Sequence, residues 1–115
     1  MDIDRYQHLS KRTAEELPDP ENVDGEGDYQ TTALFLALAL NGEAGELGEK
    51  MKKYVREDDP SYLAEAYWEL GDVLWYMAQM ASLLDVDLSE VAEDNLDKLL
   101  DRQERDVLLG DGDTR

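Results

Sequence analysis

Residues 31–55, TTALFLALALNGEAGELGEKMKKYV, and residues 62–84, YLAEAYWELGDVLWYMAQMASLL, decide the fold. In both stretches apolar residues recur at spacings of three and four, which is the period of an α-helix packed on one side. Asp59-Pro60-Ser61 lies between them and predicts a break, because proline cannot continue a helix. Two long helices joined by so short a connection can lie antiparallel.

Further helices are expected on both sides of this pair, and no strand-like alternation is sustained anywhere in the chain. Asp87 is the predicted N-cap of the last helix, and Glu90 three residues later completes a capping box. The predicted helices cover residues 3–17, 31–55, 62–84 and 88–107. The fold class predicted is therefore all-α, a bundle of about four helices forming one domain over residues 1–115.

The segments between and after the helices carry helix-breaking residues. Pro18 and Pro20 are expected to end the first helix, and residues 18–28 form an acidic loop. Asp85-Val86-Asp87 separates the last two helices, and the tail of residues 108–115 is expected to leave helical structure at Gly110.

The composition excludes several classes of protein. The 115 residues include 29 Asp+Glu against 11 Lys+Arg, no cysteine, and a single histidine, His8. Disulfides, thiolate metal sites, histidine-ligated zinc and a Ser-His-Asp triad are thereby excluded. No apolar run reaches the roughly 18 residues of a membrane span, and the N-terminus lacks a signal-peptide core. A cytoplasmic protein is expected.

The formal charge of −18 also restricts the partners. A surface this negative repels phosphate backbones and anionic lipids, so neither nucleic acid nor membrane is an expected partner. The acid excess indicates a halophilic protein adapted to a high-salt cytoplasm, where ions screen the self-repulsion. The alternative is an ordinary acidic bacterial or phage protein.

Four carboxylates stand out from this acidic background because they flank apolar helix faces. Glu43 and Glu46 lie three residues apart beside one apolar stripe, and Glu69 and Asp72 lie three apart in a helix that is apolar nearly all round. On antiparallel helices, the two pairs would form an oxygen-rich cage of the kind that Mg²⁺ or Mn²⁺ prefers. The alternative is that Glu43 and Glu46 are exposed and that Lys50 neutralises the others. A di-iron bundle would require Glu-x-x-His pairs, which are absent.

The last predicted helix carries polar and cationic residues at 3-4-3 spacing, namely Asn95, Lys98, Arg102 and Arg105. Such a stripe facing a carboxylate cage is suited to a polyphosphate. The alternative is ordinary surface pairing, for instance between Asp94 and Lys98 or between Asp101 and Arg105.

Tyr76 and Gln79 continue the face that carries Glu69 and Asp72. Stacking of Tyr76 on a base and hydrogen bonding of Gln79 to its edge would suit a nucleotide. Packing in the core is the alternative for both residues.

The residues together resemble the MazG-like branch of the all-α nucleoside triphosphate pyrophosphohydrolases. The family signature E-x-x-E followed by E-x-x-D matches Glu43, Glu46, Glu69 and Asp72. The surrounding text is more specific: GEAGELGEK, ELGDVLWY, and NLDKLLDRQ ending in a GDGD-x-R tail. At the N-terminus Tyr6, Gln7, Arg12, Thr13 and Ala14 also match, so the resemblance covers residues 4–115. The acidic 18–28 segment and ALALNGEAGEL depart from the family pattern.

The resemblance implies Mg²⁺-dependent hydrolysis of a nucleoside or deoxynucleoside triphosphate to the monophosphate and pyrophosphate, in nucleotide-pool house-cleaning. It implies Glu43, Glu46, Glu69 and Asp72 as metal ligands, with Glu46 as the residue that orients or deprotonates water. It implies phosphate binding by Lys53, Asn95, Lys98 and Arg102. Family members assemble as homodimers or homotetramers, so the bundle is expected to be completed by oligomerisation.

Four other functions remain open. A dUTP- or dCTP-specific hydrolase and a phosphoribosyl-ATP pyrophosphohydrolase use the same scaffold. A helical binding or regulatory module without turnover, or a purely structural interaction domain, would also account for the fold. Retention of all four carboxylates and of the basic stripe favours an enzyme.

Overall fold

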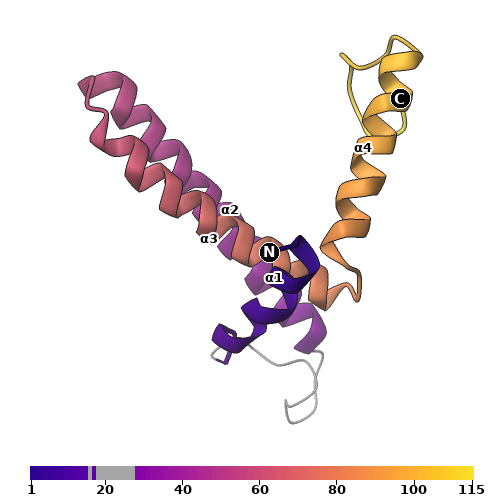
Figure 1. Ribbon diagram of the computed structural model, residues 1–115, viewed down its shortest axis with the longest axis horizontal. Coiled ribbons are helices and arrows are strands. Elements are labelled where there is room, and N and C mark those ends of the chain that lie inside the picture. The colour runs from indigo at the N-terminus through magenta and orange to yellow at the C-terminus, as the bar shows by residue number, and fades with distance from the viewer. Residues whose placement is uncertain (16, 18–27) are drawn as a thin grey trace.

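The computed structural model describes residues 1–15, 17 and 28–115 as a set of helices (Figure 1). In chain order they are α1 (Ile3–Ser10), the 3-10 helix η1 (Lys11–Thr13), α2 (Asp28–Glu57), α3 (Ser61–Leu83) and α4 (Leu88–Glu104). The described residues form no strand, which confirms the all-α prediction. Within the same residues, no helix combines the length and the apolarity needed to cross a membrane.

The first helix is shorter than predicted, because hydroxyl side chains donate hydrogen bonds to carbonyl groups at its end. α1 ends at Ser10, where a helix to Leu17 is predicted. The Ser10 hydroxyl donates to the Gln7 carbonyl at 2.7 Å, and the Thr13 hydroxyl donates to the Ser10 carbonyl at 3.0 Å. Local bonds of this kind compete with helix continuation. Pro18 and Pro20 lie outside the described residues.

The 18–28 loop prediction is wrong at its last residue, because α2 begins at Asp28. The rest of that segment lies outside the described residues. The breaks predicted around Pro60 and between the last two helices are confirmed, since α3 begins at Ser61 and α4 at Leu88.

Each of the three long helices is followed by an aspartate in the left-handed region. Asp58, Asp85 and Asp106 have φ angles of 49°, 57° and 57°. After α4, the N–H of Asp106 donates to the Gln103 carbonyl at 3.1 Å and the N–H of Val107 to the Arg102 carbonyl at 2.9 Å, which is a Schellman motif. The predicted helix 88–107 therefore ends earlier, at Glu104, because aspartate as well as glycine tolerates this conformation.

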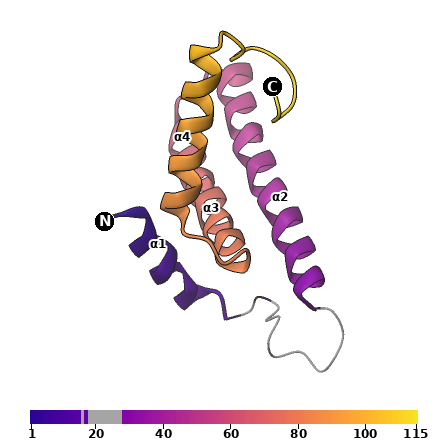
Figure 2. The same ribbon diagram turned by 90° about the vertical axis from the view of Figure 1, so that its right-hand side faces the viewer.

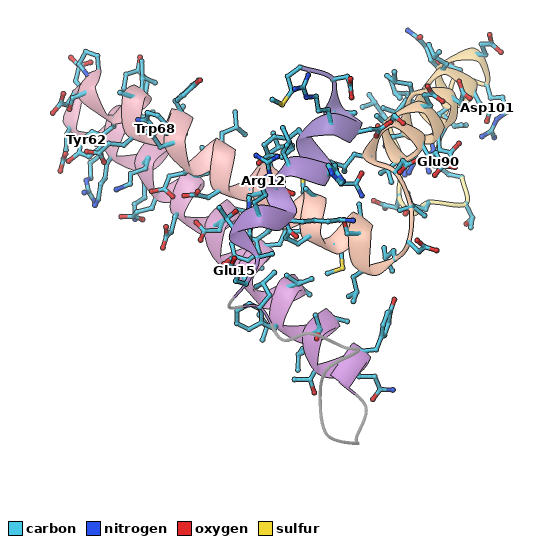
Figure 3. All side chains as sticks on the ribbon, turned by 60° about the horizontal axis from the view of Figure 1, so that its bottom comes forward. Arg12, Glu15, Tyr62, Trp68, Glu90 and Asp101 are labelled. Carbon is cyan, nitrogen blue, oxygen red and sulfur yellow. The ribbon has the colours of Figure 1, made fainter. Side chains whose placement is uncertain are left out.

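The helices are arranged as a hairpin with one diverging arm. α2 and α3 lie side by side in antiparallel directions (Figures 1 and 2). α4 extends away from them, as Figure 1 shows, and lies in front of α3 in the view of Figure 2. Trp68 and Asp101 accordingly project from different arms (Figure 3). α1 packs where the arms meet, against α3 and the start of α4. Ala78, Ala81 and Leu88 form the buried cluster at this junction.

α1 supplies hydrogen-bond partners for the first turn of α4. Gln7 Oε1 accepts from the N–H of Leu88 at 2.8 Å, and Asp4 Oδ1 accepts from the N–H of Ser89 at 2.9 Å. The bonds from Ser89 lower the pKa of Asp4. The predicted capping box of Asp87 and Glu90 is also present. These contacts satisfy free N–H groups at the helix start and fix where α4 begins.

Much of α3 is exposed, although its sequence is apolar nearly all round. Tyr67 is 70% exposed and Trp68 is 72% exposed. Leu36 is the one large side chain of the described residues that is fully buried. The reason is that α2 covers one side of α3 and α1 only its end, while α4 leaves the hairpin.

Candidate active site

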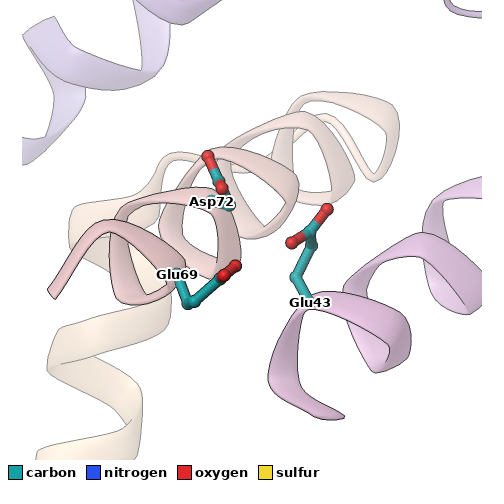
Figure 4. A group of neighbouring side chains, drawn as sticks. All are labelled: Glu43, Glu69 and Asp72. Carbon is teal, nitrogen blue, oxygen red and sulfur yellow. The ribbon is translucent and has the colours of Figure 1, made fainter. Parts of the chain in front are cut away.

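Three carboxylates converge midway along the hairpin. Glu43 projects from α2 toward Glu69 and Asp72 on α3 (Figure 4). One oxygen of each residue lies within 4.8 Å of an oxygen of the others. The spacing of three residues places Glu69 and Asp72 on one face of α3, and the antiparallel packing of α2 brings Glu43 opposite them.

The electrostatics of this cluster favour a bound cation. Burial raises the pKa of Glu43 above its ordinary value, and the negative charges of Glu46, Asp72 and Glu69 raise it further. The pKa of Glu69 is also raised, first by burial and then by hydrogen bonding to Glu46. Ionised carboxylates so close together repel one another, and a divalent cation would offset their charge. Hard oxygen donors on rigid helices fit Mg²⁺ or Mn²⁺.

Glu46, the fourth predicted ligand, lies beside the cluster of three. Its side chain is exposed. Hydrogen bonding to Glu46 contributes to the raised pKa of Glu43 and to that of Glu69. With Glu49, Lys50 and Glu69 it lines a cavity of about 270 Å³. The structure thus brings together three of the predicted metal ligands and places Glu46 beside them, in the lining of a cavity that Glu69 also lines.

The lysines of α2 are paired with carboxylates outside the cluster. Lys50 Nζ lies 3.0 Å from Glu65, which raises the pKa of Lys50. Lys53, a predicted phosphate ligand, lies 3.9 Å from Glu49. The short ion pair of Lys50 is thus with Glu65, while its positive charge also acts on Glu69 and lowers the pKa of that carboxyl.

The other predicted phosphate ligands are on α4, on the arm that diverges from the cluster. Asn95 and Lys98 are exposed, whereas Arg102 is buried. Lys98 and Arg102 both pair with Asp113 of the tail at 3.3 Å. Arg105 pairs with Asp101 at 2.7 Å, as the surface alternative predicts. Within one chain, the structure does not bring the α4 residues to the carboxylates.

The two predicted base-binding residues differ in what they contact. Tyr76 is partly buried and packs edge-on against Trp75, with ring centroids 4.9 Å apart. Gln79 is 5% exposed, and its Nε2 donates to Ser10 Oγ at 2.8 Å. The amide of Gln79 therefore holds α1 against α3, which favours the structural alternative for this residue.

Sequence reasoning did not assign Tyr6 to the site. Tyr6 packs against the buried cluster of Ala78, Ala81 and Leu88. Burial raises its pKa, and the negative charge of Asp72 raises it further. A nearby bond, from Trp75 Nε1 to Thr13 Oγ1 at 2.9 Å, holds η1 on the same helix. The available signal was the Tyr6-Gln7 pair at the start of the chain.

The fold and site define a class of protein: a helical hairpin whose clustered carboxylates are suited to a divalent cation. Residues 31–107 match the model of the MazG nucleotide pyrophosphohydrolase domain. The chain is also 40% identical, over 121 aligned positions covering 100% of both chains, to the Gene 37 protein of Mycobacterium phage L5. No solved structure matches it. The chain therefore belongs to the MazG nucleotide pyrophosphohydrolase domain family.

Proposed function

We propose that the chain is a Mg²⁺-dependent nucleoside triphosphate pyrophosphohydrolase, with Mn²⁺ as a substitute ion. Its substrate is a nucleoside or deoxynucleoside triphosphate, and its role is house-cleaning of the cytoplasmic nucleotide pool. The convergence of Glu43, Glu69 and Asp72 within 4.8 Å carries the proposal, because hydrolysis of a polyphosphate needs such a cation site. Membership of the family supports the reaction type.

In this reaction water adds across the bond between the α- and β-phosphates, giving the monophosphate and pyrophosphate. Glu43, Glu69 and Asp72 would hold the cation, which when bound neutralises phosphate charge and polarises the phosphoryl group. Glu46, which lines the adjoining cavity, accepts a proton from the attacking water at a carboxylate oxygen. Tyr76 is the remaining candidate for stacking on the base.

Two alternatives share the scaffold and are separated by substrate. A dUTP- or dCTP-specific hydrolase and a phosphoribosyl-ATP pyrophosphohydrolase would use the same carboxylates. A non-catalytic nucleotide-binding module would bind the nucleotide without turnover. The retained acidic cluster favours an enzyme over such a module.

The test is a panel of ribo- and deoxyribonucleoside triphosphates and phosphoribosyl-ATP, incubated with the full chain. We expect pyrophosphate and the monophosphate as products with Mg²⁺, and no turnover in the presence of a chelator. Release of orthophosphate in place of pyrophosphate would contradict the assigned bond cleavage. Nucleotide binding without turnover would establish the non-catalytic module.

We also propose that the chain forms a homodimer or homotetramer. The exposed side of α3 forms a groove of about 520 Å³, lined by Tyr67, Trp68, Leu70, Gly71, Val73, Leu74 and Met77. A Cβ at Gly71 would meet no atom of the chain within 4 Å, although a glycine inside a helix costs about 1 kcal/mol relative to alanine. Leu96, Leu99 and Leu100 of α4 are exposed as well. A second copy offers the apolar surface that would cover both faces.

Leu70→Glu is expected to convert the assembly to monomers, because it places a charge in the apolar groove. The native mass in solution is the measurement, with Leu109→Glu as control, since Leu109 is 97% exposed in the tail.

Assembly is also expected to depend on salt. Copies with a charge of −18 repel each other, and the screening length shortens from about 10 Å at 0.1 M salt to about 3 Å at 1 M. The wild type should therefore assemble better at 1 M. A monomer at both salt concentrations would contradict the proposal, and a mass independent of salt would contradict halophilic adaptation.

A further inference from the structure

The C-terminal tail folds back on the last turns of α4 (Figure 1). Arg115 holds it there: its guanidinium donates to the carbonyl oxygens of Val107 at 3.2 Å and Leu108 at 3.1 Å, and also to that of Gly112. Arg105 in turn donates to the carbonyl of Arg115 at 2.9 Å. The tail is thus closed into a loop whose position on α4 is defined by several bonds.

This loop places the Asp113 carboxylate on two cations of α4. Its Oδ1 accepts from Lys98 Nζ at 3.3 Å and from Arg102 Nη2 at 3.3 Å, and its backbone carbonyl accepts from Arg102 Nη2 at 2.8 Å. Arg102 is only 4% exposed, whereas the Asp113 side chain is 85% exposed. The bonds from Arg102 and Lys98 lower the pKa of Asp113, so this carboxylate is ionised at neutral pH. The Asp113 carboxylate of the chain itself is therefore paired with both Lys98 and Arg102.

Lys98 and Arg102 present donors to Asp113 in the way that they would present them to a phosphate oxygen, because both anions accept charge-assisted hydrogen bonds. We propose that Asp113 is an internal competitor for the oligophosphate of the substrate, and that the tail must leave Lys98 and Arg102 before these residues hold phosphate. The proposal rests on the proposed function for the identity of the ligand, and on the proposed second copy to bring these cations to a carboxylate cluster, because α4 diverges from the cluster of its own chain. The tail contact is then an autoinhibitory one.

Displacement of the tail is feasible because the Asp113 side chain is 85% exposed and its partner Lys98 is exposed as well. Ion pairs open to solvent are weak and screened by salt. A triphosphate offers several negative oxygens against the single carboxylate of Asp113. When a site is competent only part of the time, the apparent dissociation constant rises by the inverse of the competent fraction. A tail closed for 80–90% of the time would weaken phosphate binding by about five- to tenfold.

The decisive variant is Asp113→Asn, with Asp111→Asn as its matched control. Asp111→Asn removes the same charge from the same tail, so any general electrostatic gain in anion binding appears in both variants. The measurement is the affinity of the full chain for inorganic tripolyphosphate by calorimetry, without divalent cation. We expect Asp113→Asn to bind about five- to tenfold more tightly than the Asp111→Asn control. Weaker binding would mean that Asp113 positions the cations instead of competing, and would overturn the proposal.

Hydrogen exchange supplies an independent readout. Tripolyphosphate should speed exchange of the backbone amides of residues 110–115 in the wild type, because the tail leaves α4. Unchanged or slower exchange, or no binding of tripolyphosphate by any of the three proteins, would overturn the proposal. Neither measurement requires turnover, so a chain that binds tripolyphosphate and releases its tail but hydrolyses no nucleotide would refute only the proposed function.

Discussion

Glu69→Gln is expected to remove divalent-cation binding and to lower kcat/KM for nucleotide hydrolysis by about 10³-fold. Metal catalysis of phosphoryl transfer supplies several kcal/mol, and each 1.4 kcal/mol is about tenfold in rate. Glu69 is one of the three carboxylates that converge within 4.8 Å, so its loss leaves two ligands. Calorimetric titration with Mg²⁺ and steady-state kinetics are the measurements.

Glu65→Gln is the matched control, because Glu65 lies one helical turn earlier on α3 and pairs with Lys50 outside the cluster. It should bind Mg²⁺ like the wild type. Equal Mg²⁺ affinity for Glu69→Gln and Glu65→Gln would show that the cluster is not the metal site.

Glu69→Gln is expected to stabilise the folded chain when no metal is present. The pKa of Glu69 is raised in the folded chain. Its favourable contribution to folding is therefore present at pH values below the ordinary pKa and is lost as pH rises through the raised pKa. At neutral pH the ionised Glu69 opposes folding, so Glu69→Gln should raise the Tm without metal and abolish the Tm increase that Mg²⁺ causes in the wild type.

Glu46→Gln is expected to lower kcat by about 10²-fold or more while changing Mg²⁺ affinity little. The glutamine keeps the size and hydrogen bonding of the side chain but cannot accept a proton from water, and loss of a general base has this magnitude. Glu46 lines the cavity beside the group of three and is not one of its members, so kcat is expected to fall more than Mg²⁺ affinity. Single-turnover kinetics at saturating Mg²⁺ measure it.

Glu49→Gln is the control for this second substitution, because Glu49 lines the same cavity but pairs with Lys52 at 2.7 Å. Near-normal kcat for Glu46→Gln, with Glu43→Gln inactive, would assign the base to Glu43 instead. Full activity of both variants would mean that the carboxylates are structural.

The sequence was informative about local structure and about faces of helices. The capping box at Asp87 and Glu90 was predictable because N-capping involves residues within one turn. The ends of α1 and α4 were not, since Ser10 and Thr13 hydroxyls end the first, and Asp106 in a left-handed conformation ends the last. Serine and threonine hydroxyls form such bonds, and aspartate adopts such a conformation, at other places in proteins too. The presence of these residues therefore does not by itself mark a helix end.

The candidate site was predictable to the same degree. The proximity of Glu43, Glu69 and Asp72 was predictable, because their spacing and an antiparallel hairpin are enough to bring them together. The engagement of Gln79 with Ser10 could not be foreseen, because it depends on where α1 packs.

By itself, the sequence determined which segments are helical and which carboxylates share a helix face, and it predicted a cage of four carboxylates, of which the structure groups Glu43, Glu69 and Asp72. These properties follow from a 3.6-residue period and a short connection, and both are local. Only the tertiary structure decided that α4 leaves the hairpin and that Asp113 occupies Lys98 and Arg102. Such contacts join residues far apart along the chain or separated by a turn, and their geometry depends on how whole elements pack.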